Sequence, residues 1–243
     1  MIYPNWPAPD NIKAMTTTRN EGGVSVAPFD SLNLADHLGD DHDAVASNRQ
    51  QLFNLAQLPN TPLWLSQVHG VRVINSVDWQ MNIEADASFS STLDHVCCVM
   101  TADCLPILVC NRQGTMVAAI HAGWRSLADG IIEATLAEFK CEADDILIWL
   151  GPAIGPNQFE VGLDVYQAFT AYSPLAAQAF KQTDKTHYLA DIYQLARQRL
   201  QALNINTIYG GDYCTLSDPK RFFSYRRDDL TGRMASMIWI APK

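Results

Sequence analysis

The sequence is short of positive charge and has no long hydrophobic run. Its 243 residues include 17 Lys and Arg against 26 Asp and Glu, which gives a formal net charge of -9 at pH 7. Proteins that bind nucleic acids generally rely on basic surface to neutralise phosphates, so we expect no nucleic-acid partner. No apolar run approaches the length that spans a bilayer, so we expect no membrane partner either.

The sequence also lacks the cysteine spacing of a disulfide framework. Four of its six cysteines fall between residues 97 and 110, in a stretch that is typical of buried strands rather than of a small secreted domain. Residues 1–10 have neither the basic start nor the apolar core of a signal peptide. Both observations predict reduced thiols and a cytoplasmic protein.

The pattern of apolar residues predicts an α/β protein. Composition is ordinary for a globular chain, with 48% hydrophobic residues, and no shift in it marks a boundary, so we expect one domain over residues 1–243. Periodicity predicts helices over 43–57, 124–140, 165–172, 174–181 and 190–203. It predicts strands over 12–18, 63–68, 71–77, 95–100, 105–110, 115–120, 146–150, 205–209 and 234–240.

These elements alternate without a regular strand–helix–strand repeat, which predicts a mixed central sheet with helices on both faces. Residues 63–68 and 71–77 are expected to form a hairpin with His69 at its tip. Residues 95–100 and 105–110 are nearly all apolar and are expected to be paired strands at the centre of the sheet.

Two histidines and one cysteine stand out as candidates for chemistry: His69, Cys104 and His121. A zinc ion accepts such a set, and three protein ligands leave the fourth position open, as in catalytic zinc sites. The same residues could instead supply a Cys–His nucleophile pair, or each could be an ordinary packed or hydrogen-bonded side chain. Their spacing matches no zinc finger, so a shared site depends on the fold. Gly70 and Gly123, close to the two histidines, would allow close approach.

Further candidates surround this trio in the sequence. Asp103 precedes Cys104 and could move protons, or it could be a turn or cap residue. Residues 220–233 contain five of the 17 basic residues, which predicts either an anion site or a solvated loop with surface ion pairs. Guanidinium groups bind phosphate oxygens in forked pairs. The candidate phosphate ligands are Arg19, Ser224, Arg226 and Arg227.

Several longer segments, taken in order along the chain, resemble the YfiH family, also called the laccase-domain or polyphenol oxidase family. The resemblance runs from about Thr16 to Ile240. It implies a three-layer α/β/α fold with a mixed sheet, distantly similar to the catalytic domain of cytotoxic necrotizing factor toxins. The segments are TTRNEGGVS, SLNL, WLSQVHG, TADCLPI, IHAGWR, WLGPAIGP, FEVG, FFSYRRD and TGRMAS.

The resemblance further implies a purine nucleoside phosphorylase with adenosine deaminase activity and with zinc bound by His69, Cys104 and His121. Its substrates would be phosphate with adenosine or inosine, and methylthioadenosine is a further candidate. Deamination needs hydroxide at neutral pH, and bound zinc lowers the pKa of its water to about 7. The aromatic candidates for stacking on a purine, each also a candidate core residue, are Trp64, Trp124 and Phe223.

Three other functions fit the same residues. A copper-dependent polyphenol oxidase would use the trio with Met100 as a weak axial ligand, although six histidines are too few for the full copper set of a true laccase. A cysteine or zinc amide hydrolase that edits peptidoglycan precursors would use Cys104 as nucleophile and His121 as base. A zinc-stabilised scaffold would need no open ligand position. The sequence leaves the oligomeric state open.

Overall fold

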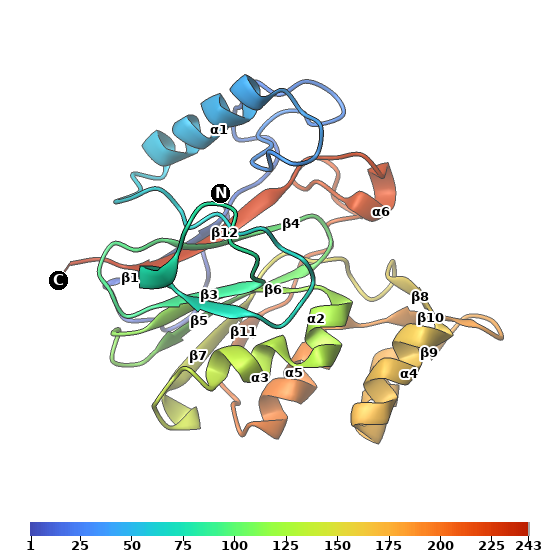
Figure 1. Cartoon of the computed structure of the whole chain (residues 1–243). Helices are drawn as coiled ribbons and strands as arrows, with labels where there is room; N and C mark the ends of the chain where they lie inside the picture. The colour runs from blue at the N-terminus through green and yellow to red at the C-terminus, as the bar shows by residue number, and fades with distance from the viewer. Residues whose placement is uncertain (243) are drawn as a thin grey trace.

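The computed structural model describes residues 1–242, and Lys243, the last residue of the predicted domain, lies outside them. Two sheets form the centre of the molecule (Figure 1). The larger is mixed and contains, in spatial order, β11 (Ile208–Gly210), β7 (Ile146–Leu150), β5 (Leu105–Asn111), β6 (Val117–Ala122), β3 (Ala87–Ser90) and β2 (Val73–Asn75). The smaller is antiparallel and contains β1 (Ile12–Thr16), β12 (Met234–Ile240) and β4 (Cys97–Thr101).

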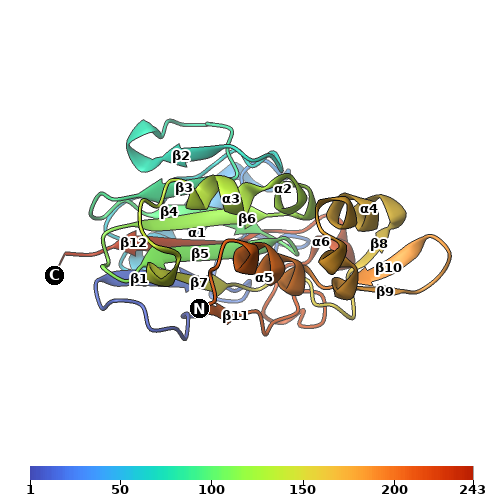
Figure 2. The same ribbon diagram turned by 90° about the horizontal axis from the view of Figure 1, so that it is seen from below.

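Helices lie on the outer faces of this pair of sheets, and a third small sheet lies to one side (Figures 1 and 2). The helices are α1 (His42–Leu55), α2 (Trp124–Asp129), α3 (Ile131–Leu136), α4 (Leu163–Tyr172), α5 (Ile192–Ala202) and α6 (Tyr225–Asp228), with 3-10 turns η1 (Ser76–Asp78), η2 (Ala143–Asp145) and η3 (Pro174–Ala179). The small sheet has the order β8 (Glu160–Gly162), β10 (His187–Ala190), β9 (Phe180–Gln182). No helix within residues 1–242 is both long and apolar enough to span a membrane.

Successive side chains along each strand point to opposite faces of its sheet, and the apolar ones form three separate clusters. In β4, Cys97 and Val99 face the larger sheet, whereas Cys98 and Met100 face α1 and contribute to the same cluster as Leu52. Helices α2, α3 and α5 cover the opposite face of the larger sheet (Figure 2). The predicted α/β fold with a mixed sheet between helices is therefore confirmed, and its β layer consists of two packed sheets.

Most predicted elements are present, with ends that differ by a few residues. The strands predicted over 146–150 and 234–240 have the predicted bounds, because both are continuous apolar runs between turn residues. The strands predicted over 12–18, 115–120 and 205–209 and the helices predicted over 43–57, 165–172 and 190–203 also form. Strand β3 and the small sheet were not predicted.

The predicted hairpin over 63–68 and 71–77 is wrong. Leu63 forms an isolated parallel bridge with Cys97, and β2 pairs in parallel with β3. The two segments pair with other strands and not with each other, so His69 lies in a connection rather than at a hairpin tip. Its backbone has a φ of 59°, a left-handed conformation that non-glycine residues seldom adopt outside constrained sites.

The predicted pairing of 95–100 with 105–110 is also wrong, although both strands are fully buried as expected. Strand β4 belongs to the smaller sheet and β5 to the larger one. The short connection after Thr101 therefore crosses from one sheet to the other. This crossing places Asp103 and Cys104 at the edge where the two sheets separate.

Two predicted helices are interrupted. The helix predicted over 124–140 is two short helices, because Gly130 has a φ of 99° and ends the first of them. The segment predicted as a helix over 174–181 begins at Pro174 as a 3-10 turn and continues as β9.

Candidate metal centre and cavity

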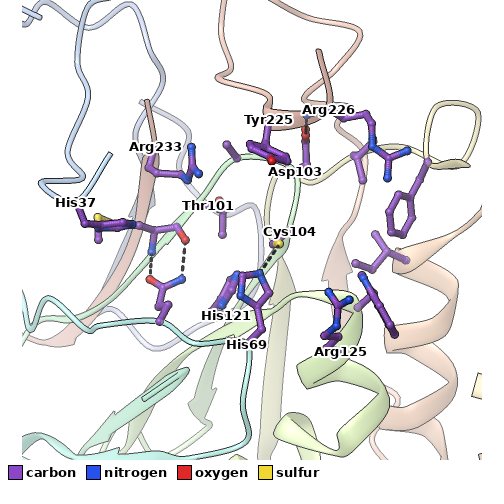
Figure 3. A pocket seen from close by; sticks show the side chains of 17 residues that line it. His37, His69, Thr101, Asp103, Cys104, His121, Arg125, Tyr225, Arg226 and Arg233 are labelled. Atoms are coloured by element: carbon purple, nitrogen blue, oxygen red, sulfur yellow. Dashed lines mark hydrogen bonds between the residues drawn. The ribbon is translucent and has the colours of Figure 1, made fainter. Parts of the chain in front are cut away.

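The antiparallel pairing of β5 with β6 brings Cys104 and His121 together. Leu105 lies opposite Ala122 in this pairing. Cys104, the residue before β5, therefore lies close to the end of β6, which contains His121. His69 reaches the same point from the connection before β2. One donor atom from each of these three residues lies within 4.8 Å of the other two. The structure thus brings together the trio that the sequence predicted (Figure 3).

The spacing of these atoms suits a tetrahedral metal ion. Cys104 Sγ and His69 Nε2 are 3.7 Å apart, which is long for a hydrogen bond that orders a site. Zinc–sulfur and zinc–nitrogen bonds of about 2.3 and 2.0–2.1 Å at a tetrahedral angle put the two ligand atoms about 3.6 Å apart. The rings of His69 and His121 meet edge to face with centroids 4.7 Å apart, so both can turn a nitrogen toward a common point.

Asp86, which the sequence did not single out, holds both histidines. Its Oδ1 lies 2.7 Å from Nδ1 of His121, and neither side chain is more than 4% exposed. The backbone N–H groups of His69 and Gly70 donate to the same carboxylate at 2.9 and 2.7 Å, and that of Val68 at 3.3 Å. With Nδ1 of His121 bound to Asp86, its Nε2 is free to face a metal, as in the carboxylate–histidine pairs of zinc sites.

The charges around Cys104 favour its thiolate form. Burial raises the pKa of the Cys104 thiol, but His121 and His69 more than offset this and lower it to about 6. Burial lowers the pKa of His121, whereas Cys104 and Asp86 raise it to about 9. Burial also acts against ionisation of Asp86, yet its hydrogen bond to His121 keeps the pKa of that carboxyl below its usual range. A thiolate is the form of cysteine that binds metals and attacks electrophiles.

Gly123 leaves the space that the trio needs. A Cβ atom at this position would lie 2.6 Å from Cδ2 of His69 and 3.3 Å from Sγ of Cys104. The first distance is shorter than carbon atoms tolerate, and both neighbours are candidate ligands. Glycine at position 123, which the sequence analysis expected to allow close approach, therefore makes room for the side chains of His69 and Cys104.

Replacing Gly123 with alanine should therefore displace His69 and weaken metal binding by about 10-fold or more, the size of effect seen when the surroundings of metal ligands change. Gly123 has a φ of -64°, so alanine introduces no backbone strain. Gly70→Ala is the matched control, because a Cβ there would make only ordinary contacts at 3.6 Å or longer. Competition with a chromophoric chelator would measure both affinities; equal affinity in Gly123→Ala and wild type would contradict the packing argument.

The trio opens into a cavity of about 370 Å³, a size ordinary for small-molecule sites. The arginines that line it are Arg125, Arg226 and Arg233. None of the three forms an ion pair with residues 1–242, in which the ion pairs are made by other arginines. Asp103 is the carboxylate on the cavity wall, and it is occupied by hydrogen bonds inside the protein. The cavity therefore offers positive charge beside the trio.

Of the predicted phosphate ligands, only Arg226 lines this cavity. The Arg19 guanidinium donates to the carbonyls of Asp30 and Pro219 and pairs with the Asp30 carboxylate. Arg227 donates to the carbonyls of Thr215, Leu216 and Phe222. Ser224 is fully buried; it caps α6, and its hydroxyl donates to Asp103. The structure places these three in the framework that supports the cavity.

Asp103 connects the ligand loop to the C-terminal segment. Its carboxylate accepts hydrogen bonds from Thr215 Oγ1 at 2.5 Å, Ser224 Oγ at 3.0 Å and the Arg226 N–H at 2.7 Å. Its backbone has a φ of 88°, which turns the chain so that Cys104 faces the cavity while the carboxylate faces the 215–226 segment. Asp103 also forms part of the cavity wall.

Only one of the three aromatic candidates lines the cavity. Trp124 lines the cavity, with the Arg125 guanidinium 4.2 Å from its ring. Phe223 is fully buried in the core, and Trp64 lines a neighbouring cavity where Arg49 covers its ring at 4.3 Å. Tyr225, which the sequence analysis missed, also lines the cavity of the trio.

Comparison with known proteins shows the family of this chain. A family model described as multi-copper polyphenol oxidoreductase laccase matches residues 13–241. The chain is 54% identical over 242 residues to the purine nucleoside phosphorylase YfiH of Escherichia coli, across 99% of this chain and 98% of that protein. It is 50% identical over 240 residues to a purine nucleoside phosphorylase of Haemophilus influenzae, across 98% of each. A Neisseria meningitidis protein of known crystal structure matches with a TM-score of 0.95 and 46% identity across 99% of both chains.

The chain belongs to the YfiH, or laccase-domain, family, as its motifs indicated. The implied likeness to cytotoxic necrotizing factor toxins stays a prediction. Within residues 1–242 the trio is the single group of three or more His, Cys, Asp or Glu side chains with converging donor atoms. One such group provides for one metal ion, fewer than the several copper ions in the family's description.

Proposed function

We propose that this protein is a zinc-dependent purine nucleoside phosphorylase that uses His69, Cys104 and His121 as metal ligands. The observation that carries the proposal is the position of this trio in a cavity lined by three arginines that form no ion pair with residues 1–242. The names of relatives that are 54% and 50% identical support the class of reaction. Adenosine and inosine are the proposed substrates, with methylthioadenosine as a further one, and the cytoplasm is the proposed location.

Phosphorolysis needs a phosphate oxygen to bond to C1′ of the ribose while the bond from C1′ to the purine breaks. The base leaves with the electron pair and takes up a proton. Arg125 and Arg226 line the cavity and offer charge-assisted hydrogen bonds to the phosphate, and Trp124 offers a ring face for stacking on the purine. Holding both reactants together removes much of the entropic barrier. Zinc, when bound, supplies a Lewis acid.

The direct test is a chromatographic product assay of zinc-loaded protein with adenosine, with and without phosphate. Adenine and ribose 1-phosphate formed only with phosphate would support phosphorolysis. Inosine formed without phosphate would support adenosine deamination, which we propose as a second activity of the same site. Unchanged adenosine in both reactions would refute both activities.

Arg226→Gln should raise the KM for phosphate by roughly 10- to 100-fold, because a hydrogen bond to a charged group contributes about 1.5–3 kcal/mol. Arg221→Gln is the matched control in the same segment, since Arg221 pairs with Asp218 at the surface. Arg227→Gln should instead lower the Tm with a smaller effect on phosphate, because its guanidinium holds backbone carbonyls. Steady-state kinetics at varied phosphate would measure the first effect, and an unchanged KM would remove Arg226 from the phosphate site.

For Asp103 we propose a positioning role. All the hydrogen bonds of its carboxylate hold the segment that contains Ser224 and Arg226. Its contribution to turnover would then be to fix Cys104 on one side and Arg226 on the other, rather than to move protons, which was one of the two roles that the sequence allowed.

A second candidate function is amide hydrolysis, with peptidoglycan precursors as the class of substrate. The observation that favours it is the series Cys104, His121, Asp86, in which a thiol, an imidazole and a buried carboxylate follow one another. This is the arrangement of a nucleophile, a base and a group that orients the base. Activity that survives chelators and is lost on thiol alkylation would support it, whereas chelator-sensitive activity would exclude it.

Copper at the trio is the third proposal. Met100, the axial ligand that the sequence suggested, lines the same cavity, but its side chain packs in the cluster beneath α1 and would have to turn toward the trio. Two His, one Cys and a weak Met are the ligands of blue-copper sites. Anaerobic loading with Cu²⁺ should then give an intense blue colour. A colourless copper complex would exclude this arrangement.

A further inference from the structure

Thr101 carries a buried hydroxyl that the protein itself leaves without a partner. It is the last residue of β4 and is 2% exposed. Its Oγ1 has no hydrogen-bond partner within residues 1–242. Thr101 nevertheless lines the cavity of the metal trio, and Figure 3 shows it between Arg233 and Cys104. A buried polar atom without a partner costs roughly 1–3 kcal/mol, and such atoms in native proteins commonly have a functional explanation.

The backbone around Thr101 is held firmly. Thr101 lies opposite Met234 in the pairing of β4 with β12. The preceding residue, Met100, is fixed by Gln67, whose side chain accepts from its N–H at 2.7 Å and donates to its carbonyl at 2.8 Å. The hydroxyl is therefore presented at a defined position and does not depend on a mobile loop.

Arg233 lines the cavity on the same side as Thr101 in Figure 3. One of its terminal nitrogens donates to the carbonyls of Thr231 and Gly232 at 2.8 and 3.1 Å, which fixes the side chain. Its other nitrogens make no hydrogen bond or ion pair with residues 1–242. The guanidinium thus has donors to spare, and Thr101 has an oxygen that can accept or donate.

We propose that Thr101 is a specificity-determining residue that, together with Arg233, binds a ribose hydroxyl of the nucleoside. This inference rests on the proposed function. A sugar hydroxyl can donate to Thr101 Oγ1 and accept from Arg233 at the same time. Phosphate is assigned to the opposite wall, because Arg125 and Arg226 lie across the trio from Arg233 in Figure 3. With the ribose at Thr101 and Arg233 and the phosphate at Arg125 and Arg226, C1′ would lie between the two groups, beside the metal ligands.

The test compares Thr101→Val and Thr101→Ser with wild type, all loaded with zinc. Valine keeps the shape and the strand preference of threonine and removes only the hydroxyl. The substrates are adenosine, 2′-deoxyadenosine and 3′-deoxyadenosine, each with saturating phosphate. Thr231→Val is the matched control, because the Thr231 hydroxyl is also buried, at 1% exposure, and has no partner within residues 1–242, but the residue does not line the cavity. The substitution keeps the backbone carbonyl of residue 231 that accepts from Arg233.

We expect Thr101→Val to lower kcat/KM for adenosine about 10-fold, in line with the loss of one hydrogen bond, and to leave kcat/KM unchanged for one of the two deoxynucleosides. The preference for the ribose hydroxyl would thus disappear in this variant. Thr101→Ser should keep the preference. The Tm of both valine variants should equal or exceed that of wild type, because neither loses an internal hydrogen bond.

Other outcomes would overturn the inference in distinguishable ways. An equal loss on all three substrates, or a fall in Tm confined to Thr101→Val, would show a structural role for the hydroxyl. A change in the KM for phosphate alone would assign Thr101 to the anion. If wild type neither binds nor converts any of the three nucleosides, the proposed function fails and the ribose assignment fails with it.

Discussion

Replacing Cys104 with alanine is expected to abolish metal binding and to reduce turnover by more than about 100-fold, beyond the 10- to 100-fold effect of altering groups that only support metal ligands. Cys104 supplies the single thiolate of the trio, and its thiol has a pKa of about 6 beside the two histidines. Two imidazoles would remain, and they hold zinc far less well than a three-ligand set. Metal analysis by mass spectrometry after gel filtration, followed by the adenosine assay, would measure both effects.

Cys141→Ala is the matched control for this experiment, because Cys141 is a half-buried free thiol outside the cavity. The same pair of variants separates the two leading functions. Loss of metal together with loss of turnover supports a metal-dependent enzyme. A Cys104→Ala protein that retains zinc but is inactive would favour a nucleophilic thiol, and full activity without metal would refute both roles.

The sequence predicted the trio because the candidate residues are chemically distinctive. His69, Cys104 and His121 each stand next to an apolar run, and the chain has only six histidines and six cysteines. Their convergence could not be derived from spacing. It depends on β4 and β5 belonging to different sheets and on the pairing of β5 with β6, which are long-range contacts without a local signal.

Asp86 and Arg125 were missed, and Arg233 was not selected from the basic segment, for a related reason. Asp86 is a carboxylate between Ala85 and Ala87 at the start of a buried strand, and a charge in such a place needs partners. That local contrast is the signal that could have identified it. Arg125 has no comparable signal. Arg233 lies in the basic segment that was predicted as a possible anion site, but nothing in the sequence separates it from Arg221 and Arg227, which do not line the cavity.

The phosphate candidates show how the fold redistributes a charge cluster. Arg226 and Arg227 are adjacent in α6, yet only Arg226 lines the cavity, whereas Arg227 binds backbone carbonyls. One position along a helix rotates the side chain by about 100°. Composition could therefore indicate an anion site in this segment but could not choose between neighbours.

Asp86→Asn is expected to weaken metal binding by about 10- to 100-fold, although it changes only one atom of the side chain. Oδ1 of Asp86 accepts from His121 and from the His69 N–H, and Oδ2 accepts from the Gly70 N–H at 2.7 Å. An asparagine can place an oxygen on one side only, so its amide NH₂ must face donors on the other. The connection that carries His69 or the ring of His121 would then shift. Isothermal titration with zinc would measure the change, with exposed Asp129→Asn as the control.

The same substitution should alter how the stability of the metal-free protein depends on pH. The folded-state pKa of Asp86 lies below its usual value of about 3.9. The stabilisation it provides is therefore fully present above that unfolded value and is lost as pH falls through the lower folded value. Asp86→Asn should be less stable than wild type at neutral pH, and the difference should narrow as the pH falls below about 4. If the difference were constant across this range, the carboxylate charge would not be what holds His121 and the connection before β2 in place.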